Sequence, residues 1–382
     1  MKLTGDWLTR RETRQLFDLY AAARYELFAV GGCVRAELMG EPVSDIDMAS
    51  NAPPETAMAF LRAAGLKVIP TGIDHGTITA VVANTPFEIT TYRRDVETDG
   101  RRAVVAFSDR LEDDAQRRDF TMNALYAAAD GTITDPVGGL PDLQARRVRF
   151  IGNAVDRIRE DYLRTLRFFR FSARYANSEN GFDAEALAAI AENISGLNSL
   201  SRERVTTELL KLLKARDPLR AVMTMTRIGV TAQILPGCDP TPFGPYLHFE
   251  DRLGIAPHPV HRLAALISED VAETLRLSRA QMRELAGLRR LATGTCSIGE
   301  LGYRLGAEDG RVAFALRCAF LELVPAGNAT VAIDKGARAK FPISASDLID
   351  SYSGQELGDQ LKSLEQRWIE SEFKLTREEL LQ

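Results

Sequence analysis

The sequence predicts an α+β protein in which a small mixed sheet with its helices comes first and an all-helical region follows. Short β-forming runs alternate with helical segments over roughly the first 150 residues. From about residue 154 onward, apolar residues recur at helical spacing to the end of the chain. At 382 residues the chain is too long for one core. We expect four domains: an α/β head at 1–150 and helical neck, body and tail domains at 151–215, 216–300 and 301–382.

Composition narrows the class of protein. The chain is 45% hydrophobic and 26% charged, has no apolar run long enough to span a membrane, and begins without an apolar signal core. Its four cysteines lack paired spacing, which favours a reducing cytoplasm and argues against structural zinc. A net charge of −5 argues against nucleic acid, but residues 146–174 carry nine arginines against three acids. We therefore expect a cytoplasmic protein with one locally basic surface.

The element that organises the first domain is a glycine turn between a strand and a helix. A β-forming run at residues 27–30 enters Gly31 and Gly32, and a helix-compatible segment at 35–39 follows. Glycines at a helix start expose backbone N–H groups, including that of Cys33, which can bind phosphate. Taken alone, such a turn is usually only a tight connection.

Two carboxylates follow this turn. Asp45 and Asp47 are spaced i, i+2, so on a strand they share one face while Ile46 points into the core. Adjacent carboxylates repel one another unless a cation lies between them, which indicates a pair of Mg²⁺ ligands. Taken alone, the pair would be a solvated strand end. Together with the glycine turn it indicates a site for a nucleoside triphosphate and its metal.

The other expected elements of this region follow in chain order. Helices are predicted at 8–25 and 53–64, and strands at 67–70, 77–82 and 87–92. Glu88 alternates with apolar neighbours on the last of these strands. It is either an exposed strand residue or a third metal ligand.

Paired arginines are the next candidates for binding. Arg117 and Arg118 precede an acid and an apolar segment that contains Asn123. They could be solvated charges beside a capped helix. Next to a triphosphate they are better explained as phosphate ligands, because guanidinium groups bind phosphate oxygens bidentately.

A second charged pair lies in the predicted neck. Asp161 and Arg164, preceded by Glu160, share one face if the segment is helical. The simplest interpretation is a helix-surface salt bridge. The alternative is that the pair presents hydrogen-bond donors and an acceptor to the edge of a nucleobase. Three further arginines recur on one helical face and could bind an RNA backbone: Arg167, Arg170 and Arg174.

The histidines give weaker signals. His75 precedes a predicted strand, and a lone histidine is more often structural than catalytic. His258 and His261 are three residues apart, but no neighbouring His-Asp pair or carboxylate cluster in the sequence supports a metal site. We expect a structural role for His258 and His261.

In order along residues 25–215, these motifs resemble the class II tRNA nucleotidyltransferase (CCA-adding enzyme) and bacterial poly(A) polymerase family of the polymerase-beta superfamily. The specific strings are Val30–Arg35 with Asp45-Ile46-Asp47, Arg117–Ala124, and Glu160-Asp161 with Arg164. Residues 92–107, centred on Asp99, Gly100 and Arg101, could be a solvated hairpin. They also resemble the mobile loop that this family places over its active site.

The resemblance implies template-independent addition of CCA to the 3′ end of tRNA from CTP and ATP, with Mg²⁺ as cofactor and recognition of the acceptor–T arm. It implies no protein partner, and the lack of a long apolar run predicts no membrane partner. The implied roles are metal binding and catalysis by Asp45 and Asp47, with Glu88 as a possible further ligand; triphosphate binding by Gly31, Gly32, Cys33, Arg35, Arg117 and Arg118; and base recognition by Glu160, Asp161, Arg164 and Asn123. A poly(A) polymerase, an enzyme that adds only CC, and a non-catalytic nucleotide or RNA sensor remain open. Where the family usually has Asp after the motif arginine, this chain has Ala36, and Glu37 could replace it.

Overall fold

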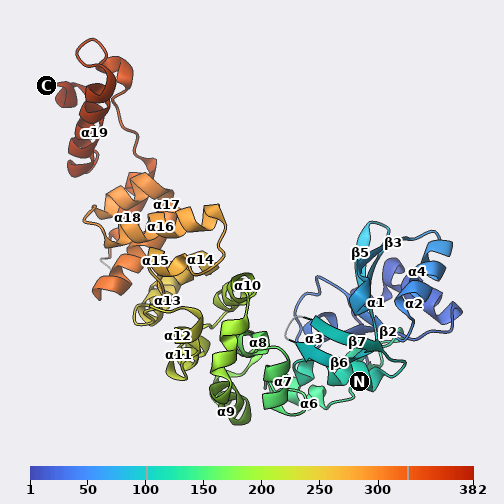
Figure 1. Ribbon diagram of the computed structural model, residues 1–382. Coiled ribbons are helices and arrows are strands. Elements are labelled where there is room, and N and C mark those ends of the chain that lie inside the picture. The colour runs from blue at the N-terminus through green and yellow to red at the C-terminus, as the bar shows by residue number, and fades with distance from the viewer. Residues whose placement is uncertain (100–101, 325–326) are drawn as a thin grey trace. The chain divides into compact units, whose positions relative to one another are not determined.

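The structure is a computed structural model that describes residues 1–99, 102–324 and 327–382. It divides into two compact units, 1–200 and 201–382 (Figure 1). The head–neck boundary expected at residue 150 therefore falls inside the first unit. The finer division into four domains remains a prediction.

The first unit contains a seven-stranded mixed sheet, which confirms the α+β prediction for this region. Its strand order is β3-β4-β5-β2-β1-β8-β9; β2 and β5 are parallel, and the other neighbouring pairs are antiparallel. The strands are β1 (Leu27–Val30), β2 (Asp47–Ser50), β3 (Lys67–Gly72), β4 (Thr77–Val82), β5 (Thr85–Thr91), β8 (Tyr126–Ala127) and β9 (Ile133–Thr134).

Alternating burial fixes which side chains of the central strands reach solvent. On β5, Phe87 and Ile89 are buried and Glu88 between them is exposed. Around β2, Ile46 and Met48 are buried on either side of an exposed Asp47, as a period of two requires. Helices accompany the sheet in Figure 1, and they are α1 (Asp6–Thr9), α2 (Arg11–Ala22), α3 (Gly32–Leu38), α4 (Pro54–Ala63), α5 (Leu111–Gln116) and α6 (Gly139–Gln144), with 3-10 turns η1 (Ile73–His75) and η2 (Thr121–Asn123).

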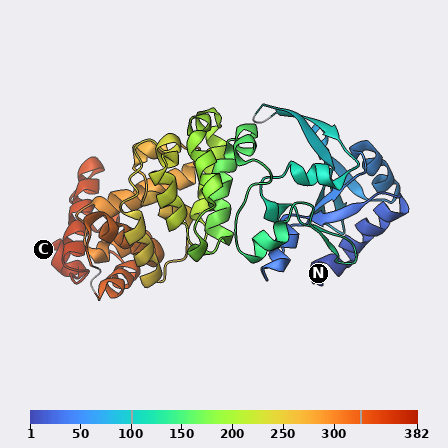
Figure 2. The same cartoon turned by 90° about the horizontal axis from the view of Figure 1, so that it is seen from below.

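A separate antiparallel hairpin follows β5. It consists of β6 (Arg93–Asp99) and β7 (Arg102–Phe107) and extends away from the seven-stranded sheet in Figure 2. Residues 92–107, for which a solvated hairpin and a mobile loop over the active site were both considered, thus form a hairpin in the described residues, and the mobile-loop role remains a prediction. Asp99 ends β6, whereas Gly100 and Arg101 lie outside the described residues.

Helices complete the first unit. The segment from Asp161 to Arg164, which was considered as one helix, is interrupted. Asp161 has extended backbone angles (φ −155°, ψ 105°) and ends α7, so it does not share a helix with Arg164. Its carboxylate accepts the N–H of Leu163 at 3.1 Å, a local bond that competes with helix continuation and opens α8 instead. These elements are α7 (Ala154–Glu160), α8 (Leu163–Tyr175), η3 (Ser178–Asn180), α9 (Ala184–Glu192) and η4 (Ile194–Ser199).

The second unit is helical, as predicted. Toward its C-terminal end, Trp368 centres a cluster of apolar side chains that includes Leu364 and Ile369. No helix in the described parts of the chain has the length and apolar character needed to cross a bilayer. The helices are α10 (Arg202–Leu213), α11 (Leu219–Arg227), α12 (Val230–Ile234), α13 (Phe243–Arg252), α14 (Pro259–Ala264), α15 (Glu269–Ala272), α16 (Arg279–Thr293), α17 (Ile298–Leu321), α18 (Ala329–Arg338), η5 (Ala345–Asp347), α19 (Gly354–Glu370) and α20 (Arg377–Leu381).

Candidate active site

The glycine turn adopts the conformation that its sequence suggests. Gly31 has φ +69° and connects β1 to α3, a backbone region that residues with a side chain rarely occupy. A Cβ there would lie 3.4 Å from the carbonyl oxygen of Asn123 and 3.6 Å from Nη1 of Arg118. At Gly32 a Cβ would meet no atom within 4 Å. The turn therefore leaves open space at the start of α3, bordered by one arginine.

Cys33 contributes to this turn only through its backbone. Its side chain is buried, with Sγ 3.5 Å from the carbonyl oxygen of Val30. Burial, and next the charge of Asp47, raise the pKa of the thiol to about 12. The side chain is therefore neutral and faces the protein interior, so its thiol does not bind phosphate.

Two of the acidic residues lie side by side on neighbouring inner strands of the sheet. Asp47 on β2 is paired in parallel register with Glu88 on β5, and both side chains are exposed on the same face. Asp45 precedes β2 and is exposed as well. Loss of hydration and then the charges of Glu88 and Asp45 raise the pKa of Asp47, whereas Arg118 lowers it. The structure thus pairs Glu88 with Asp47, and the role of Glu88 as a third metal ligand remains a prediction.

The donor set suits a hard divalent cation, because carboxylate oxygens are the protein ligands that Mg²⁺ prefers. Burial and then the repulsion from Glu88 raise the pKa of Asp47, and a cation would relieve that repulsion. The oxygens of Asp45, Asp47 and Glu88 do not all lie within 4.8 Å of one another. A bound cation would therefore draw at least one of these side chains inward.

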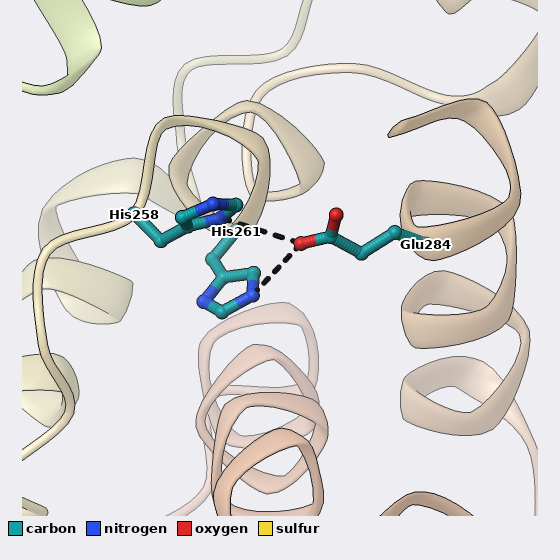
Figure 3. Close-up of side chains that lie close together, drawn as sticks. All are labelled: His258, His261 and Glu284. Atoms are coloured by element: carbon teal, nitrogen blue, oxygen red, sulfur yellow. Dashed lines mark ion pairs between the residues drawn. The ribbon is translucent and has the colours of Figure 1, made fainter. Parts of the chain in front are cut away.

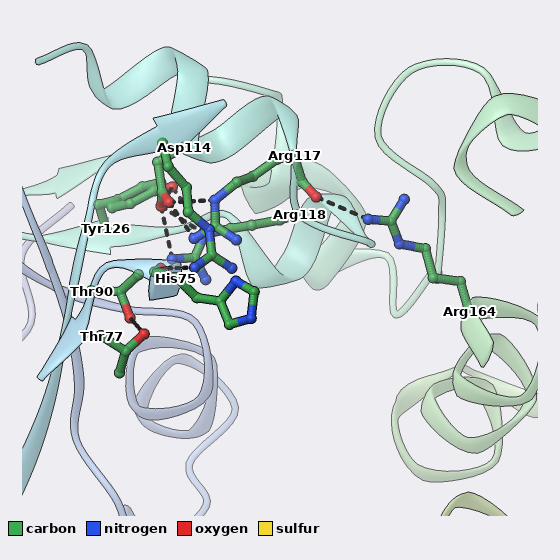
Figure 4. A network of polar contacts seen from close by, with 9 residues as sticks. His75, Thr77, Thr90, Asp114, Arg117, Arg118, Tyr126 and Arg164 are labelled. Carbon is green, nitrogen blue, oxygen red and sulfur yellow. Dashed lines mark hydrogen bonds and ion pairs between the residues drawn. The ribbon is translucent and has the colours of Figure 1, made fainter. Parts of the chain in front are cut away.

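A buried carboxylate orients the two arginines (Figure 4). Asp114 on α5 has no exposed surface and accepts from Nε and Nη2 of Arg117 at 2.8 and 2.5 Å. Its other oxygen accepts from Nε and Nη2 of Arg118 at 3.1 and 2.8 Å and from the hydroxyl of Tyr126 at 2.8 Å. Burial alone would raise the pKa of Asp114, but Arg118 and Arg117 lower it to about 2. The carboxylate is therefore ionised and holds both guanidinium groups in place.

This network leaves one nitrogen of Arg118 available. Nε and Nη2 are used by Asp114 and Tyr126, whereas Nη1 has no hydrogen-bond partner in the described part of the chain. That nitrogen is the one that faces Gly31. Arg118 is thus fixed on one side and presents donors to the open space at the glycine turn on the other.

Arg35 lies in surroundings that do not fit the predicted role in phosphate binding. Its side chain is buried, donates through Nη1 to Oδ1 of Asn123, and donates through Nη2 to the hydroxyl of Tyr175 at 3.1 Å. Its guanidinium also packs over the rings of Phe171 and Tyr175. Arg35 therefore attaches α3 to α8. Its neighbour Asn123 is 7% exposed and bonded to Asp119, so its predicted contact with a base does not fit either.

We expect Tyr175→Phe to lower the free energy of unfolding by about 1.5–3 kcal/mol, the range for a hydrogen bond to a charged group. The ring that covers Arg35 is kept, so the loss reports the hydroxyl bond alone. Urea unfolding of the full chain measures it. Tyr25→Phe is the matched control, because the Tyr25 hydroxyl makes no hydrogen bond among the residues described and its ring stacks on Phe60. Equal effects of the two changes would contradict the role assigned to Tyr175.

Glu37 does not replace the acid that the family usually has after the motif arginine. Its carboxylate accepts the backbone N–H groups of Thr4 and Gly5 at 2.8 Å each, and the indole N–H of Trp7 at 2.5 Å. Glu37 thus anchors the N-terminal segment. Arg35 is held by Asn123 and Tyr175 instead, so Ala36 does not leave it without support.

The predicted base-reading residues approach the site from the neck helices. Arg164 donates to Oε2 of Glu160 at 2.5 Å, to the carbonyl oxygen of Arg157 at 3.0 Å and, across to the head, to that of Arg117 at 3.2 Å (Figure 4). Three of its five donors are thus used, and two have no acceptor in the ranges described. Asp161 lies at the junction of α7 and α8, directly after Glu160. A hydrogen bond therefore connects Arg164, a predicted base-recognition residue, to the backbone of Arg117.

The predicted RNA-binding stripe on α8 instead contacts the head domain. Arg167 donates through Nε to Asp119 at 2.7 Å, and Arg174 donates to Glu41 at 3.0 Å. Arg170 packs over the ring of Phe171. Arg167 and Arg174 therefore help to hold α8 on the head, and RNA binding by the stripe remains a prediction without support in these contacts.

His75 ends η1 and is exposed, and its carbonyl oxygen accepts from Nη1 of Arg93. The adjacent Gly76 has φ +78°, and a Cβ there would lie 2.8 Å from Phe107. This glycine thus leaves room for Phe107, at the end of β7, beside the turn that precedes β4. These contacts place His75 at the base of the hairpin and give no indication of a catalytic role.

Two residues that organise the site were missed by the sequence analysis. Asp114 lies three and four residues before the paired arginines, which is helical contact spacing, so this signal was available. Tyr175 could not have been found in this way, because its bond to Arg35 spans 140 residues.

Comparison with known proteins gives the family. A sequence model for the poly A polymerase head domain matches residues 27–149, and one described as a probable RNA and SrmB-binding site of polymerase A matches 181–241. The mitochondrial CCA tRNA nucleotidyltransferase 1 of Mus musculus is 34% identical over 388 residues, which cover 96% of this chain and 88% of the mouse protein. This chain belongs to the CCA tRNA nucleotidyltransferase family.

Other members support the same assignment. The Homo sapiens CCA tRNA nucleotidyltransferase 1 is 35% identical with the same coverage. The crystal structure of the Bacillus stearothermophilus CCA-adding enzyme in complex with CTP superposes with a TM-score of 0.74 at 26% identity, covering 95% of this chain and 93% of that one. The resemblance drawn from the motifs is therefore confirmed, and the chain is an enzyme of the nucleotidyltransferase class.

Proposed function

We propose that this chain adds CCA to the 3′ end of tRNA from CTP and ATP without a nucleic-acid template. The observation that carries the proposal is the position of Arg118. Its free Nη1 borders the open space at Gly31, and its charge is felt by Asp47, which is paired with Glu88 on the next strand. A triphosphate in that space would meet a hydrogen-bond donor for its phosphate oxygens on one side and metal-binding carboxylates on the other.

The chain's own residues have separate tasks in this proposal. Asp45, Asp47 and Glu88 would hold Mg²⁺, which would neutralise triphosphate charge and acidify the attacking 3′-hydroxyl of the RNA. Arg118, oriented by Asp114, would bind phosphate oxygens, and Gly31 would permit their close approach to the backbone. Arg117 supports the site through Asp114 and through the carbonyl oxygen that Arg164 contacts.

Choice of nucleotide is assigned to Arg164, with Asp161 beside it. The two donors of Arg164 that remain without acceptors could pair with acceptor atoms on a cytosine or adenine edge. The bonds to Glu160 and to the carbonyl oxygen of Arg117 would hold the guanidinium rigid for this purpose. The helical second unit would recognise the acceptor–T arm of tRNA by shape. A cytoplasmic location remains a prediction, and the mouse and human relatives are named mitochondrial.

The direct test is extension of tRNA that lacks its 3′ end. We expect two additions with Mg²⁺ and CTP alone, and a stop after three with CTP and ATP, when product lengths are read on a gel. A stop after two with both nucleotides would indicate an enzyme that adds only CC. A long ladder with ATP alone would indicate a poly(A) polymerase. No extension under any condition would favour a nucleotide or RNA sensor.

A further inference from the structure

The second unit contains a cluster of two histidines and a glutamate that the proposed reaction does not use. His258 caps α14, His261 lies on α14, and Glu284 lies on α16 (Figure 3). Nδ1 of His258 and Nε2 of His261 lie 3.2 and 3.0 Å from the same oxygen, Oε1 of Glu284. One ligand atom from each residue lies within 4.8 Å of the other two. Among the residues described, this is the one group of three such side chains that meets this limit.

The distances correspond to those between ligands of a small metal ion. With metal–ligand bonds of about 2.0–2.1 Å, two ligands of a tetrahedral zinc ion are about 3.3 Å apart. Both contacts to Glu284 are close to this value. The two rings are 4.3 Å apart between centroids and tilted by 51°, so they approach the carboxylate from different directions.

Hydrogen bonding does not account for the whole cluster. Nδ1 of His258 is buried and has no hydrogen-bond partner, although Glu284 is only 3.2 Å away, because the N–H direction does not align with that oxygen. A buried nitrogen without a partner costs free energy, and a metal ion bound at Nδ1 of His258 would remove that cost.

We propose that His258, His261 and Glu284 bind a divalent transition-metal ion, with Zn²⁺ as the expected occupant. Imidazole nitrogens favour zinc, copper, iron or nickel over magnesium and calcium, and two imidazoles with a carboxylate form a known zinc ligand set. Oδ1 of Asp309 on α17 is 3.9 Å from Nε2 of His261 and adds a second carboxylate next to the cluster. A cavity of about 330 Å³ that His258, His261, Glu308 and Asp309 help to line has room for a water ligand.

The ion would connect two helices that are separate in sequence. Its ligands come from the start of α14 and from the first half of α16, which pack against each other in this unit. A metal bound only in the folded state stabilises it by mass action. The site thus has a structural role in the helical unit, distinct from the carboxylate site for nucleotide chemistry.

Cobalt substitution on the full chain tests this proposal without measuring activity. Co²⁺ is titrated in excess Mg²⁺, which occupies oxygen-ligand sites and leaves imidazole sites open. We expect strong visible d–d bands of tetrahedral Co²⁺ at one ion per chain, and their loss when Zn²⁺ is added. His261→Ala and Glu284→Gln should weaken binding by at least about 100-fold, since changes to residues around metal ligands alone cost about 10–100-fold.

His248→Ala is the matched control, because this exposed histidine on α13 is outside the cluster. It should leave the cobalt spectrum unchanged. Absence of the visible bands in the wild-type chain would overturn the proposal whatever the variants do. So would a thiolate-to-cobalt band, which would assign the ion to a cysteine. If circular dichroism shows that His261→Ala does not fold, His258→Ala provides the test, because the His258 side chain is 45% exposed and its removal should leave the fold intact. Retained cobalt binding in His258→Ala would refute the site.

Discussion

Asp47→Asn is expected to reduce nucleotide incorporation by at least about a thousand-fold. Metal and charge stabilisation at such a site contributes several kcal/mol to the reaction, and each 1.36 kcal/mol is tenfold in rate. The side chain is exposed, so its replacement creates no cavity, and removing the repulsion from Glu88 should leave the fold intact. Single-turnover incorporation of CMP into tRNA that lacks CCA measures the effect.

Asp18→Asn is the matched control for this change. Asp18 is also an exposed carboxylate of the first unit, but it lies on α2, outside the candidate site. It should retain full activity. Binding of tRNA without nucleotide should be equal in both variants and the wild type. Incorporation by Asp47→Asn at more than about a tenth of the wild-type rate would exclude Asp47 from the reaction.

Asp114→Asn is expected to destabilise the first unit by about 3–5 kcal/mol, the range for removing one partner of a buried ion pair. Asparagine keeps the size of the side chain but leaves Arg117 and Arg118 without their counter-charge. The KM for CTP should also rise by at least about tenfold, because Arg118 loses the partner that orients it. Urea unfolding and initial rates at varied CTP measure the two effects.

The same substitution should change the pH dependence of stability. Because Arg118 and Arg117 lower the pKa of Asp114 to about 2, against about 3.9 in an unfolded chain, its contribution is complete above about pH 4. It is lost as the pH falls toward 2, where the carboxylate takes up a proton. The wild type should therefore lose more stability than the variant over this interval.

Glu112→Gln serves as the control, because Glu112 is an exposed neighbour whose contact to Arg110 is a surface ion pair at 3.6 Å. It should change stability by less than about 0.5 kcal/mol. Equal stability loss in Asp114→Asn and Glu112→Gln would show that the buried network does not hold the arginines.

Local sequence patterns were sufficient for the features that depend on near neighbours. The alternation around Asp47 and Glu88 predicted which side chains face solvent, because a strand alternates its faces regardless of what packs on it. The turn at Gly31 was predicted by its two glycines, because few other residues tolerate a positive φ. Spacing failed at Asp161, where one side-chain bond to Leu163 interrupted an otherwise helical pattern.

By itself, then, the sequence determined the α+β class, the carboxylate pair, the glycine turn and the family, all of which follow from short-range periodicity and ordered motifs. Only the tertiary structure decided what the arginines contact. Arg35 and Arg118 have the same chemistry, but burial against Tyr175 removes the first from the site and Asp114 directs the second into it. Likewise, Glu284 joins two histidines 23 and 26 residues earlier in the chain. Such contacts depend on helix packing, which no local pattern specifies.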